Sequence, residues 1–289
     1  MSDDGARVPA WVDRRLAGHS PGSGAAKVLQ ALAAHPRQMS YASTSAAARL
    51  AEVNVATVVR AAQLLGFSGW PALRAEIRSR YLSGLSASQV LTEHDATEDG
   101  PARATLRREL SNLQDLSAVL DEEQIQRVAH LIVDARVTLV LGSGSFAAPG
   151  LQLAHLAQTI GHDVRLHQGG GTGLLNAVSL LGEGDCLVAL HLWRSPREIL
   201  DALRLAHERR VPVVLVSDRA GEPFSRWATE LVHVPSEGAS MFPSVVAATT
   251  VVQAVVAAVV AIDPDRASRA SDDIQALWDR YGLFPSPNE

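Results

Sequence analysis

Hydrophobic and polar positions repeat with a helical period through the first part of the chain. Between residues 44 and 65, two short apolar stripes are separated by a polar break that ends at Asn54, and Gly66 follows the second stripe. Thr44 or Ser45 could cap the first helix and Asn54 the second, because a side-chain oxygen there accepts from free backbone N–H groups. A glycine just past the last turn is typical of a helix end. The pattern predicts two helices joined by a tight turn.

After residue 136 the pattern changes to short apolar runs that alternate with helical stretches. The runs at 136–141, 186–192 and 211–217 are continuously apolar, as expected for strands buried on both faces of a sheet. Shorter or weaker runs lie at 164–167 and 231–235. Such alternation predicts a parallel sheet between two layers of helices. We therefore expect a multi-domain chain, with an all-α helix-turn-helix domain followed by an α/β three-layer parallel-sheet domain.

The remaining stretches complete the expected organisation. Residues 83–100 are rich in Ser, Thr, Asp and Glu and are predicted to form a linker. The apolar stretch 245–262 is close to the lower length limit for a membrane span. Its alanine content and its end at Asp263-Pro264 favour a buried helix at a subunit interface instead, so we expect no membrane partner. Further helices are predicted at 9–16, 25–34, 71–82 and 101–120. One more follows the cap residue Asp121, and another lies after the glycine loop and ends at residue 160. The last three are predicted at 174–181, 195–210 and 272–281.

Composition and charge narrow the class of protein. The chain has 289 residues and a single cysteine, Cys186, inside an apolar run, so we expect a buried thiol and no disulfide within the chain. With no leader pattern at the start, a reducing cytoplasm is the expected compartment. Residues 1–85 hold ten Lys and Arg against five Asp and Glu, a net charge of +5, which leaves −10 for the rest. A basic first domain suits binding to a phosphate backbone.

The helix pair could place its second helix in the major groove of DNA. The first turn of a recognition helix should carry small or hydrogen-bonding groups, and this one offers Asn54, Ala56 and Thr57. Arg60, one turn on, can reach a phosphate, and Gln63 could also face the DNA. An ordinary α-hairpin inside a helical core is the alternative. The candidate DNA-binding residues are Ser45, Asn54, Ala56, Thr57, Arg60 and Gln63.

The amino-acid sequence of this stretch resembles that of the N-terminal domain of RpiR-type bacterial transcription regulators. In that family a short "aTvvR" run is followed by "lGFsGf.elr", and residues 56–60 and 65–70 match these two motifs closely. Asn54 stands where the family usually has serine, and both residues are good caps. The resemblance covers roughly residues 20–82 and implies a DNA-binding helix-turn-helix.

Three loops at the predicted carboxyl ends of the strands are candidates for a ligand site, because open parallel sheets bind ligands there. Gly142-Ser143-Gly144-Ser145 could offer backbone N–H groups, hydroxyls and a helix N-terminus to an anion. Ser195-Pro196-Arg197-Glu198 reads as a capping box that places Arg194 and Arg197 near another helix start. A stable helix start with solvated arginines is the alternative. Glu237 could bind sugar hydroxyls or simply face water.

The order of these segments resembles the sugar isomerase (SIS) fold over roughly residues 122–264. Three segments match the family pattern. Residues 142–145 match its G-x-G-S loop, residues 214–218 match its "a.iTd" strand, and residues 234–237 match the final "vp.e" segment. The middle motif departs, because His191, Trp193, Arg194 and Pro196 replace the hydroxyls and glycine that the family uses. A larger or differently charged effector, or a domain without a ligand, then becomes an alternative to a phosphosugar. The candidate effector-binding residues are Ser143, Gly144, Ser145, Trp193, Arg194, Ser195, Arg197 and Glu237.

RpiR-type regulators join these two domains in this order, so the resemblances imply a transcription regulator. We expect operator DNA and a small anionic, phosphosugar-like effector as partners, a homodimer or homotetramer, and neither cofactor nor metal. A phosphosugar isomerase-type enzyme is the second hypothesis, with His191, Glu198 and Glu237 as candidate bases, although no familiar catalytic set is visible. The expected domains are 1–85 (helix-turn-helix), 86–121 (linker and bridging helix), 122–264 (SIS-like) and 265–289 (C-terminal helix and tail).

Overall fold

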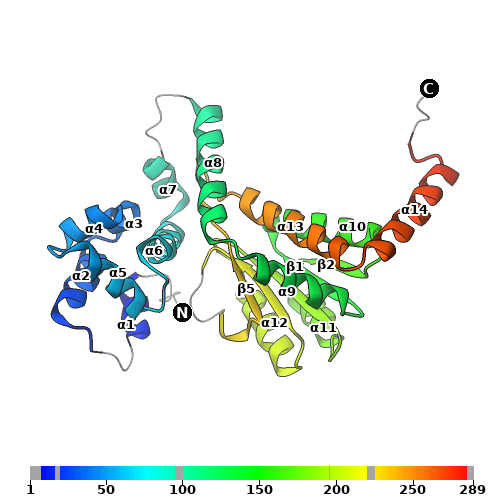
Figure 1. Ribbon diagram of the computed structural model, residues 1–289, viewed down its shortest axis with the longest axis horizontal. Coiled ribbons are helices and arrows are strands. Elements are labelled where there is room, and N and C mark those ends of the chain that lie inside the picture. The colour runs from blue at the N-terminus through cyan, green and yellow to red at the C-terminus, as the bar shows by residue number, and fades with distance from the viewer. Residues whose placement is uncertain (1–7, 17–19, 95–99, 195, 220–224, 285–289) are drawn as a thin grey trace. The chain divides into compact units, whose positions relative to one another are not determined.

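The computed structural model describes residues 8–16, 20–94, 100–194, 196–219 and 225–284 (Figure 1). The chain forms two compact units. The first consists of Met1–Arg108 together with Glu237–Pro243, and the second of Glu109–Ser236 together with Ser244–Glu289. A short segment near residue 240 is therefore part of the unit formed by the start of the chain, which the sequence pattern does not predict.

The first unit is helical. The pair α4 and α5 corresponds to the predicted helix-turn-helix, and two further helices, α3 and α7, were not predicted, the second of them inside the expected linker. Helix α8 begins in this unit and ends in the other. The helices are α1 (Val8–Arg15), α2 (Ser23–Ala34), α3 (Pro36–Tyr41), α4 (Thr44–Leu50), α5 (Val55–Leu64), α6 (Trp70–Gly84), α7 (Ala87–His94) and α8 (Pro101–Val119).

Caps fix the ends of the helix pair. Ser43 caps α4, since its hydroxyl accepts from the N–H of Ala46 at 3.2 Å, so the expected cap at Thr44 or Ser45 is wrong by one residue. The Asn54 cap of α5 is confirmed, because its side chain accepts from the N–H of Thr57 at 2.9 Å. Gly66 adopts a φ of +83°, the left-handed conformation expected after a helix end.

Two tryptophans anchor the core of the first unit. Trp11 and Trp70 are each 1% exposed. The indole N–H of Trp70 donates to the carbonyl of Ala42 at 2.9 Å, and the Trp11 ring meets Phe67 edge-on with centroids 5.9 Å apart. Burying an indole ring removes a large apolar area from water and thereby stabilises the fold. The other large, almost fully buried side chains here are Leu32, Met39, Leu65, Leu73, Ile77 and Leu82.

The second unit is built on a parallel sheet with strand order β2-β1-β3-β4-β5 within the described residues, which confirms the α/β prediction. Every adjacent pair is parallel, with Leu141 opposite Ala189 in one register and Ala189 opposite Leu215 in the next. The strands are β1 (Thr138–Gly142), β2 (Val164–Gln168), β3 (Cys186–His191), β4 (Val213–Ser217) and β5 (Glu230–His233).

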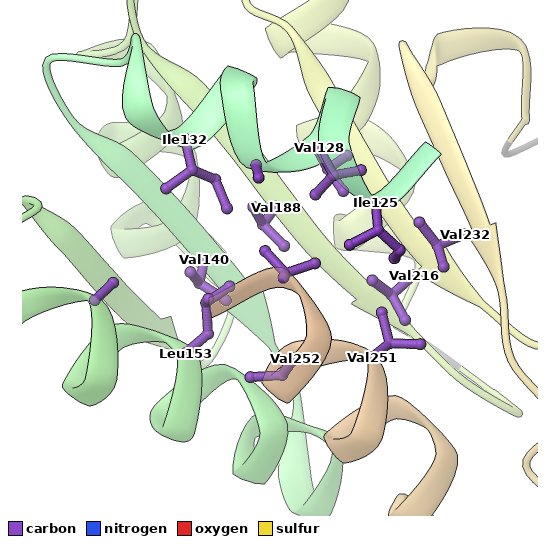
Figure 2. Close-up of a cluster of buried hydrophobic side chains, with 14 of the residues drawn as sticks. Ile125, Val128, Ile132, Val140, Leu153, Val188, Val216, Val232, Val251 and Val252 are labelled. Atoms are coloured by element: carbon purple, nitrogen blue, oxygen red, sulfur yellow. The ribbon is translucent and has the colours of Figure 1, made fainter. Parts of the chain in front are cut away.

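Alternate strand residues face two helical layers, because side chains of a strand alternate between the faces of a sheet. Val140, Val188 and Val216 pack beneath α9, α10 and α13 (Figure 2). Leu141, Leu187 and Leu215 belong to the cluster with α11 and α12 on the other face. The helices are α9 (Glu122–Val133), α10 (Ala147–Thr159), α11 (Gly171–Ser179), α12 (Arg197–Glu208), α13 (Val246–Ile262) and α14 (Pro264–Arg280), and 3-10 turns lie at Gly144–Phe146 and Ser225–Trp227.

Helix α13 owes its apolar composition to burial within its own unit. Val251, Val252, Val255 and Val259 lie in the core cluster shared with the sheet and α9. In the described part of the chain, no single helix is long and apolar enough to cross a membrane. Among the described residues, α13 and α14 taken together have the length and apolar composition of a span, but the two helices are bent by 106° relative to each other.

Helix α14 begins earlier than predicted. Asp263 accepts from the N–H of Arg266 at 3.0 Å and Pro264 occupies the first turn, so Asp263-Pro264 starts this helix. The apolar pattern indicates these two residues only as the end of the helix before them. Proline is common at the first position of a helix, where its missing N–H is not needed.

Candidate DNA-binding and effector sites

The turn between α4 and α5 is compact. Glu52 adopts a positive φ of 52°, and the N–H of Val53 donates to the carbonyl of Ala48 at 2.9 Å. These contacts close the end of α4 and redirect the chain so that α5 starts two residues later. The helix pair is thus held by backbone hydrogen bonds as well as by apolar packing.

Helix α5 has one buried and one exposed face. Its buried residues are Thr57, Val58, Ala61 and Ala62. Two residues of the predicted apolar stripes, Leu50 of α4 and Val55 of α5, are instead 39% and 45% exposed. The candidate DNA-binding residues that the structure leaves exposed are Ser45, Asn54, Ala56, Arg60 and Gln63.

Thr57 does not share this exposure, which corrects the expectation that it contacts a base edge. It is 8% exposed, and a Cβ added to Gly24 of α2 would lie 2.9 Å from its methyl carbon. Its hydroxyl donates to Asn54 Oδ1 at 2.9 Å and accepts from Arg60 Nη2 at 3.0 Å. Thr57 therefore packs on α2 and joins the helix cap to the exposed arginine. The helical period could have placed it inward, since Ala61, four residues further on and on the same face of the helix, is buried.

At the carboxyl end of β1 the chain enters a 3-10 turn before α10. Gly142 is required there, because an added Cβ would lie 2.6 Å from the Cα of Ala147. Gly144 has a φ of +57° and open space around its Cα, and both Gly144 and Ser145 are exposed. Ser143 is partly buried. The loop can therefore offer hydroxyls and backbone N–H groups to a ligand beyond the sheet.

A buried carboxylate holds the loop after β3. Asp218, 2% exposed, accepts from the backbone N–H of Trp193 at 3.2 Å and from the hydroxyl of Ser236 at 2.7 Å. Arg219 Nη2 donates to the carbonyl of Trp193 at 2.7 Å. These contacts fix Trp193 in a left-handed conformation with a φ of 59°. A constrained loop at this edge of the sheet is a feature that functional sites often have.

Asp218, Arg219 and Ser236 shape this site but are not among the candidate residues, although Asp218 and Ser236 lie in the matched segments 214–218 and 234–237. Asp218 directly follows an apolar strand, so its place at the sheet edge was predictable. Its contact with Trp193 was not, because the two residues are 25 positions apart. The side chains of Arg194 and Arg197 are exposed near the start of α12. Ser195 lies outside the described residues.

Glu198 makes a different contact from the one predicted. Its carboxylate accepts from the N–H of Gly171 at 3.0 Å, at the start of α11. Helix α12 begins at Arg197 with Pro196 at its N-cap, so the expected capping box around Glu198 is wrong. Gly170 leaves the room for this contact, because an added Cβ would overlap the Glu198 carboxylate. A carboxylate stabilises the positive end of a helix dipole.

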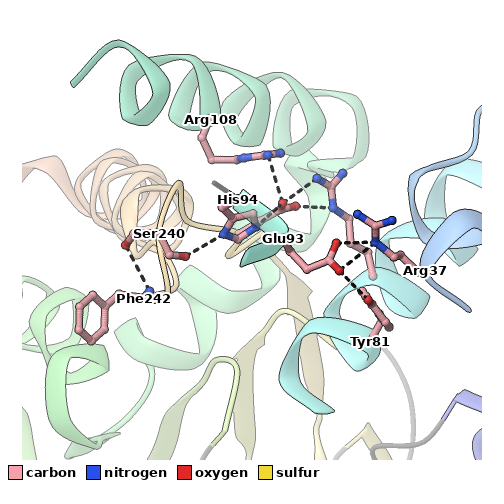
Figure 3. Close-up of polar contacts among 9 residues, drawn as sticks. Arg37, Tyr81, Glu93, His94, Arg108, Ser240 and Phe242 are labelled. Carbon is pink, nitrogen blue, oxygen red and sulfur yellow. Dashed lines mark hydrogen bonds and ion pairs between the residues drawn. The ribbon is translucent and has the colours of Figure 1, made fainter. Parts of the chain in front are cut away.

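Glu237 belongs to the first unit, whereas the other effector candidates belong to the second. Its carboxylate pairs with Arg78 of α6, accepting from Nη2 at 2.7 Å, and with Arg108 of α8 at 3.2 Å (Figure 3). His94 Nε2 lies 3.1 Å away, and His94 Nδ1 lies 2.8 Å from the carbonyl of Ser240. We therefore correct the expectation that Glu237 binds sugar hydroxyls, since cations of its own unit surround its oxygens.

The charges around Glu237 decide its ionisation. Burial alone would raise the pKa of Glu237, but the hydrogen bond from His94 and the charges of Arg78 and Arg108 outweigh it and hold the pKa below its ordinary value. A neighbouring cluster joins Arg37, Tyr81 and Glu93 (Figure 3). There, burial and the hydrogen bond to Glu93 raise the pKa of Tyr81 to about 12.

Comparison with known proteins assigns both units. The helix-turn-helix domain of the rpiR family matches residues 23–84, and the SIS domain matches residues 131–261. The HTH-type transcriptional regulator HexR of Pseudomonas aeruginosa is 27% identical over 218 residues, which cover 72% of this chain and 73% of HexR.

Two solved structures share the fold. The sugar isomerase domain of an RpiR transcription factor from Sphaerobacter thermophilus aligns with a TM-score of 0.57 and 25% identity, covering 60% of this chain and 96% of that one. The NanR protein of Vibrio vulnificus, complexed with ManNAc-6P, aligns with a TM-score of 0.62 and 18% identity over 96% of this chain and 100% of NanR. At that identity the second likeness shows the fold alone.

Proposed function

Since this chain belongs to the RpiR-type transcription regulators, with an rpiR-family helix-turn-helix followed by a SIS domain, we propose that α5 is its recognition helix. The observation that carries the proposal is the exposed face of α5, on which Ala56, Arg60 and Gln63 recur at helical spacing. Gln63 has the amide that pairs with adenine in the major groove, and Arg60 has the charge that binds phosphate or guanine. Asn54 and Ser45 lie exposed beside them.

We further propose that the SIS domain binds a small anionic effector, of the phosphosugar class, beyond the carboxyl ends of β1 and β3. Gly144 and Ser145 offer donors, and Arg194 and Arg197 supply positive charge in place of the hydroxyls that the family motif has. Ser143 and Trp193 complete the group. The effector acts by binding one state of the regulator more tightly than the other.

The regulator is proposed to act as a homodimer or homotetramer on a roughly two-fold operator, as helix-turn-helix proteins do when paired half-sites are read. Its place of action is then the cytoplasm, where bacterial operators are. We infer a binding rather than a catalytic role for the SIS domain, because the relatives named above are regulators and the chain carries the DNA-binding domain that an isomerase does not need.

DNA binding is tested with Arg60→Ala. We expect weaker binding to all duplexes and a salt slope lower by about 1, because one phosphate contact and its counterion release are lost. Fluorescence anisotropy of the full chain on duplexes enriched from a random-sequence pool, at several salt concentrations, measures both. Arg204→Ala removes an equal charge from exposed α12 and is the matched control. A salt slope that is the same in Arg60→Ala and the control would contradict the phosphate contact.

Effector binding is tested by thermal shift with a panel of phosphosugars, amino sugars and sugar acids. A ligand that binds the folded chain raises the melting temperature by mass action. We expect a shift with at least one phosphorylated sugar, and we expect the double variant Arg194→Ala, Arg197→Ala to lose it while Arg204→Ala keeps it. A shift retained in the double variant would remove these arginines from the site.

A further inference from the structure

The first turn of α5 presents methyl groups to the outside. Val55 is the first residue of α5 and is 45% exposed, and Ala56 beside it is exposed as well. The apolar pattern assigns Val55 to the core, but the core of this unit is completed by Val58, Ala61 and Ala62 instead. A single exposed valine is common on protein surfaces. Val55 differs because it lies in the first turn of the proposed recognition helix.

The hydrogen-bond acceptor of the cap residue Asn54 and the hydroxyl of Thr57 are used inside the protein. Asn54 Oδ1 accepts from both the N–H and the hydroxyl of Thr57, each at 2.9 Å, and Thr57 is 8% exposed. The next long polar side chains on the exposed face are Arg60 and Gln63, one and two turns further along. Besides the exposed cap residue Asn54, the start of α5 therefore offers an approaching surface the methyl groups of Val55 and Ala56.

In the major groove only one base carries a complementary group. The residues at the start of a recognition helix contact base edges, and of the four bases only thymine presents a methyl group there. Valine in a helix is held almost entirely in one χ1 rotamer, so its methyl groups are placed with little loss of entropy on contact.

We propose that Val55, together with Ala56, reads operator DNA by packing on the 5-methyl group of thymine. Val55 is thus a specificity-determining residue that selects an A·T pair opposite the first turn of α5 in each half-site. The inference rests on the proposed role of α5 in DNA binding, and it adds the class of base that this turn selects.

The test replaces thymine with deoxyuridine, which differs only by the missing methyl group. Duplexes enriched by the wild-type full chain from a random-sequence pool are remade with one thymine at a time replaced. Burial of a methyl group predicts about a fourfold loss of affinity at one thymine per half-site, measured by anisotropy. In Val55→Ala we expect the same replacement to cost less than about twofold, because the two γ-methyl groups of Val55 that make most of the contact are gone.

Leu91→Ala is the matched control, since Leu91 is 42% exposed on α7 in the same unit. It should keep the wild-type loss, and the melting temperatures of all three proteins should agree because both substituted residues are exposed. A wild-type chain insensitive to every replacement, or a Val55→Ala variant as sensitive as wild type, would overturn the inference while DNA binding stands. Failure of the wild-type chain to enrich any duplex would overturn the DNA-binding role and this inference together.

Discussion

Thr57 serves two neighbours at once. Its methyl group packs on Gly24, and its hydroxyl joins the cap residue Asn54 to the exposed Arg60. In this arrangement, the buried Thr57 holds the guanidinium of Arg60, which is proposed to contact DNA. The residue acts through its neighbours rather than through a contact of its own.

Replacing Thr57 by valine separates these two tasks. Thr57→Val keeps the shape that packs on Gly24 and removes the hydroxyl, so the guanidinium of Arg60 loses its tether. We expect DNA affinity to fall about two- to tenfold, the range of one hydrogen bond, in anisotropy titrations. Thr57→Ser keeps the hydroxyl and should retain the affinity; an equal loss in both variants would contradict the tether.

Cys186 gives a second prediction at this scale. It is fully buried in β3, and burial raises the pKa of its thiol to about 12, so almost no thiolate exists at neutral pH. We expect the folded chain to resist a thiol reagent such as DTNB for as long as it remains folded. In denaturant the one thiol of the chain should react completely, which provides the control. Rapid labelling of the native protein would contradict the burial.

At the scale of elements, helix starts depend on single polar side chains. Asn54 caps α5 and stands where the family usually has serine. We expect Asn54→Ser to leave the free energy of unfolding nearly unchanged, because serine caps about as well, and Asn54→Ala to lower it by about 1 kcal/mol. Urea unfolding followed by circular dichroism measures both. A serine variant as unstable as the alanine variant would show that capping is not what Asn54 supplies.

The strands were the most predictable elements, and the reason is physical. A strand buried on both faces must be apolar along its whole length, so β3 and β4 are visible as uninterrupted runs. The short helices α3 and α7 were not predicted, because α3 begins at a proline that usually ends a helix and α7 lies in a polar stretch that is typical of a linker. Leu50 and Val55 fit the helical period and are nevertheless exposed, because shorter alanines fill the interface between the helices.

The candidate site was predictable only where it is formed by residues that are neighbours in the sequence. The glycine loop at 142–145 sits where a strand must give way to a helix, so its position was evident from the sequence. The contact of Asp218 with Trp193 and that of Glu198 with Gly171 join residues that are 25 and 27 positions apart. Such contacts depend on how strands are ordered in the sheet, which periodicity does not reveal.

At the scale of the whole molecule, the loss of stability at low pH should depend in part on protonation of Glu237. A carboxyl group with a lowered pKa in the folded chain adds stability that is present above its unfolded value, near 4.5, and is lost as the pH falls through the folded value. Glu237→Gln should therefore be less stable than wild type at neutral pH, on the order of 2 kcal/mol, because Arg78 and Arg108 lose their counter-ion in a partly exposed setting.

Melting temperatures between pH 3 and pH 7 test this expectation. The difference between wild type and Glu237→Gln should begin to shrink as the pH falls below about 4.5, because the carboxyl group of the unfolded chain takes up its proton first, and it should be lost once the pH falls through the lower pKa of the folded chain. Glu183→Gln is the control, because the Glu183 side chain is 72% exposed in the second unit and its substitution leaves the Glu237 cluster intact. A constant difference down to pH 3 would show that the charge of Glu237 contributes nothing to folding.

The segment 237–243 has a practical consequence for anyone who divides this chain. It is joined at both ends to the sheet-bearing unit and yet belongs to the helical one. A fragment cut after residue 108 would therefore carry two arginines and a histidine without the carboxylate that they surround. A chimaera that transplants the DNA-reading head onto another sensor would have to graft two separate pieces of sequence, because one splice point cannot transfer the whole unit.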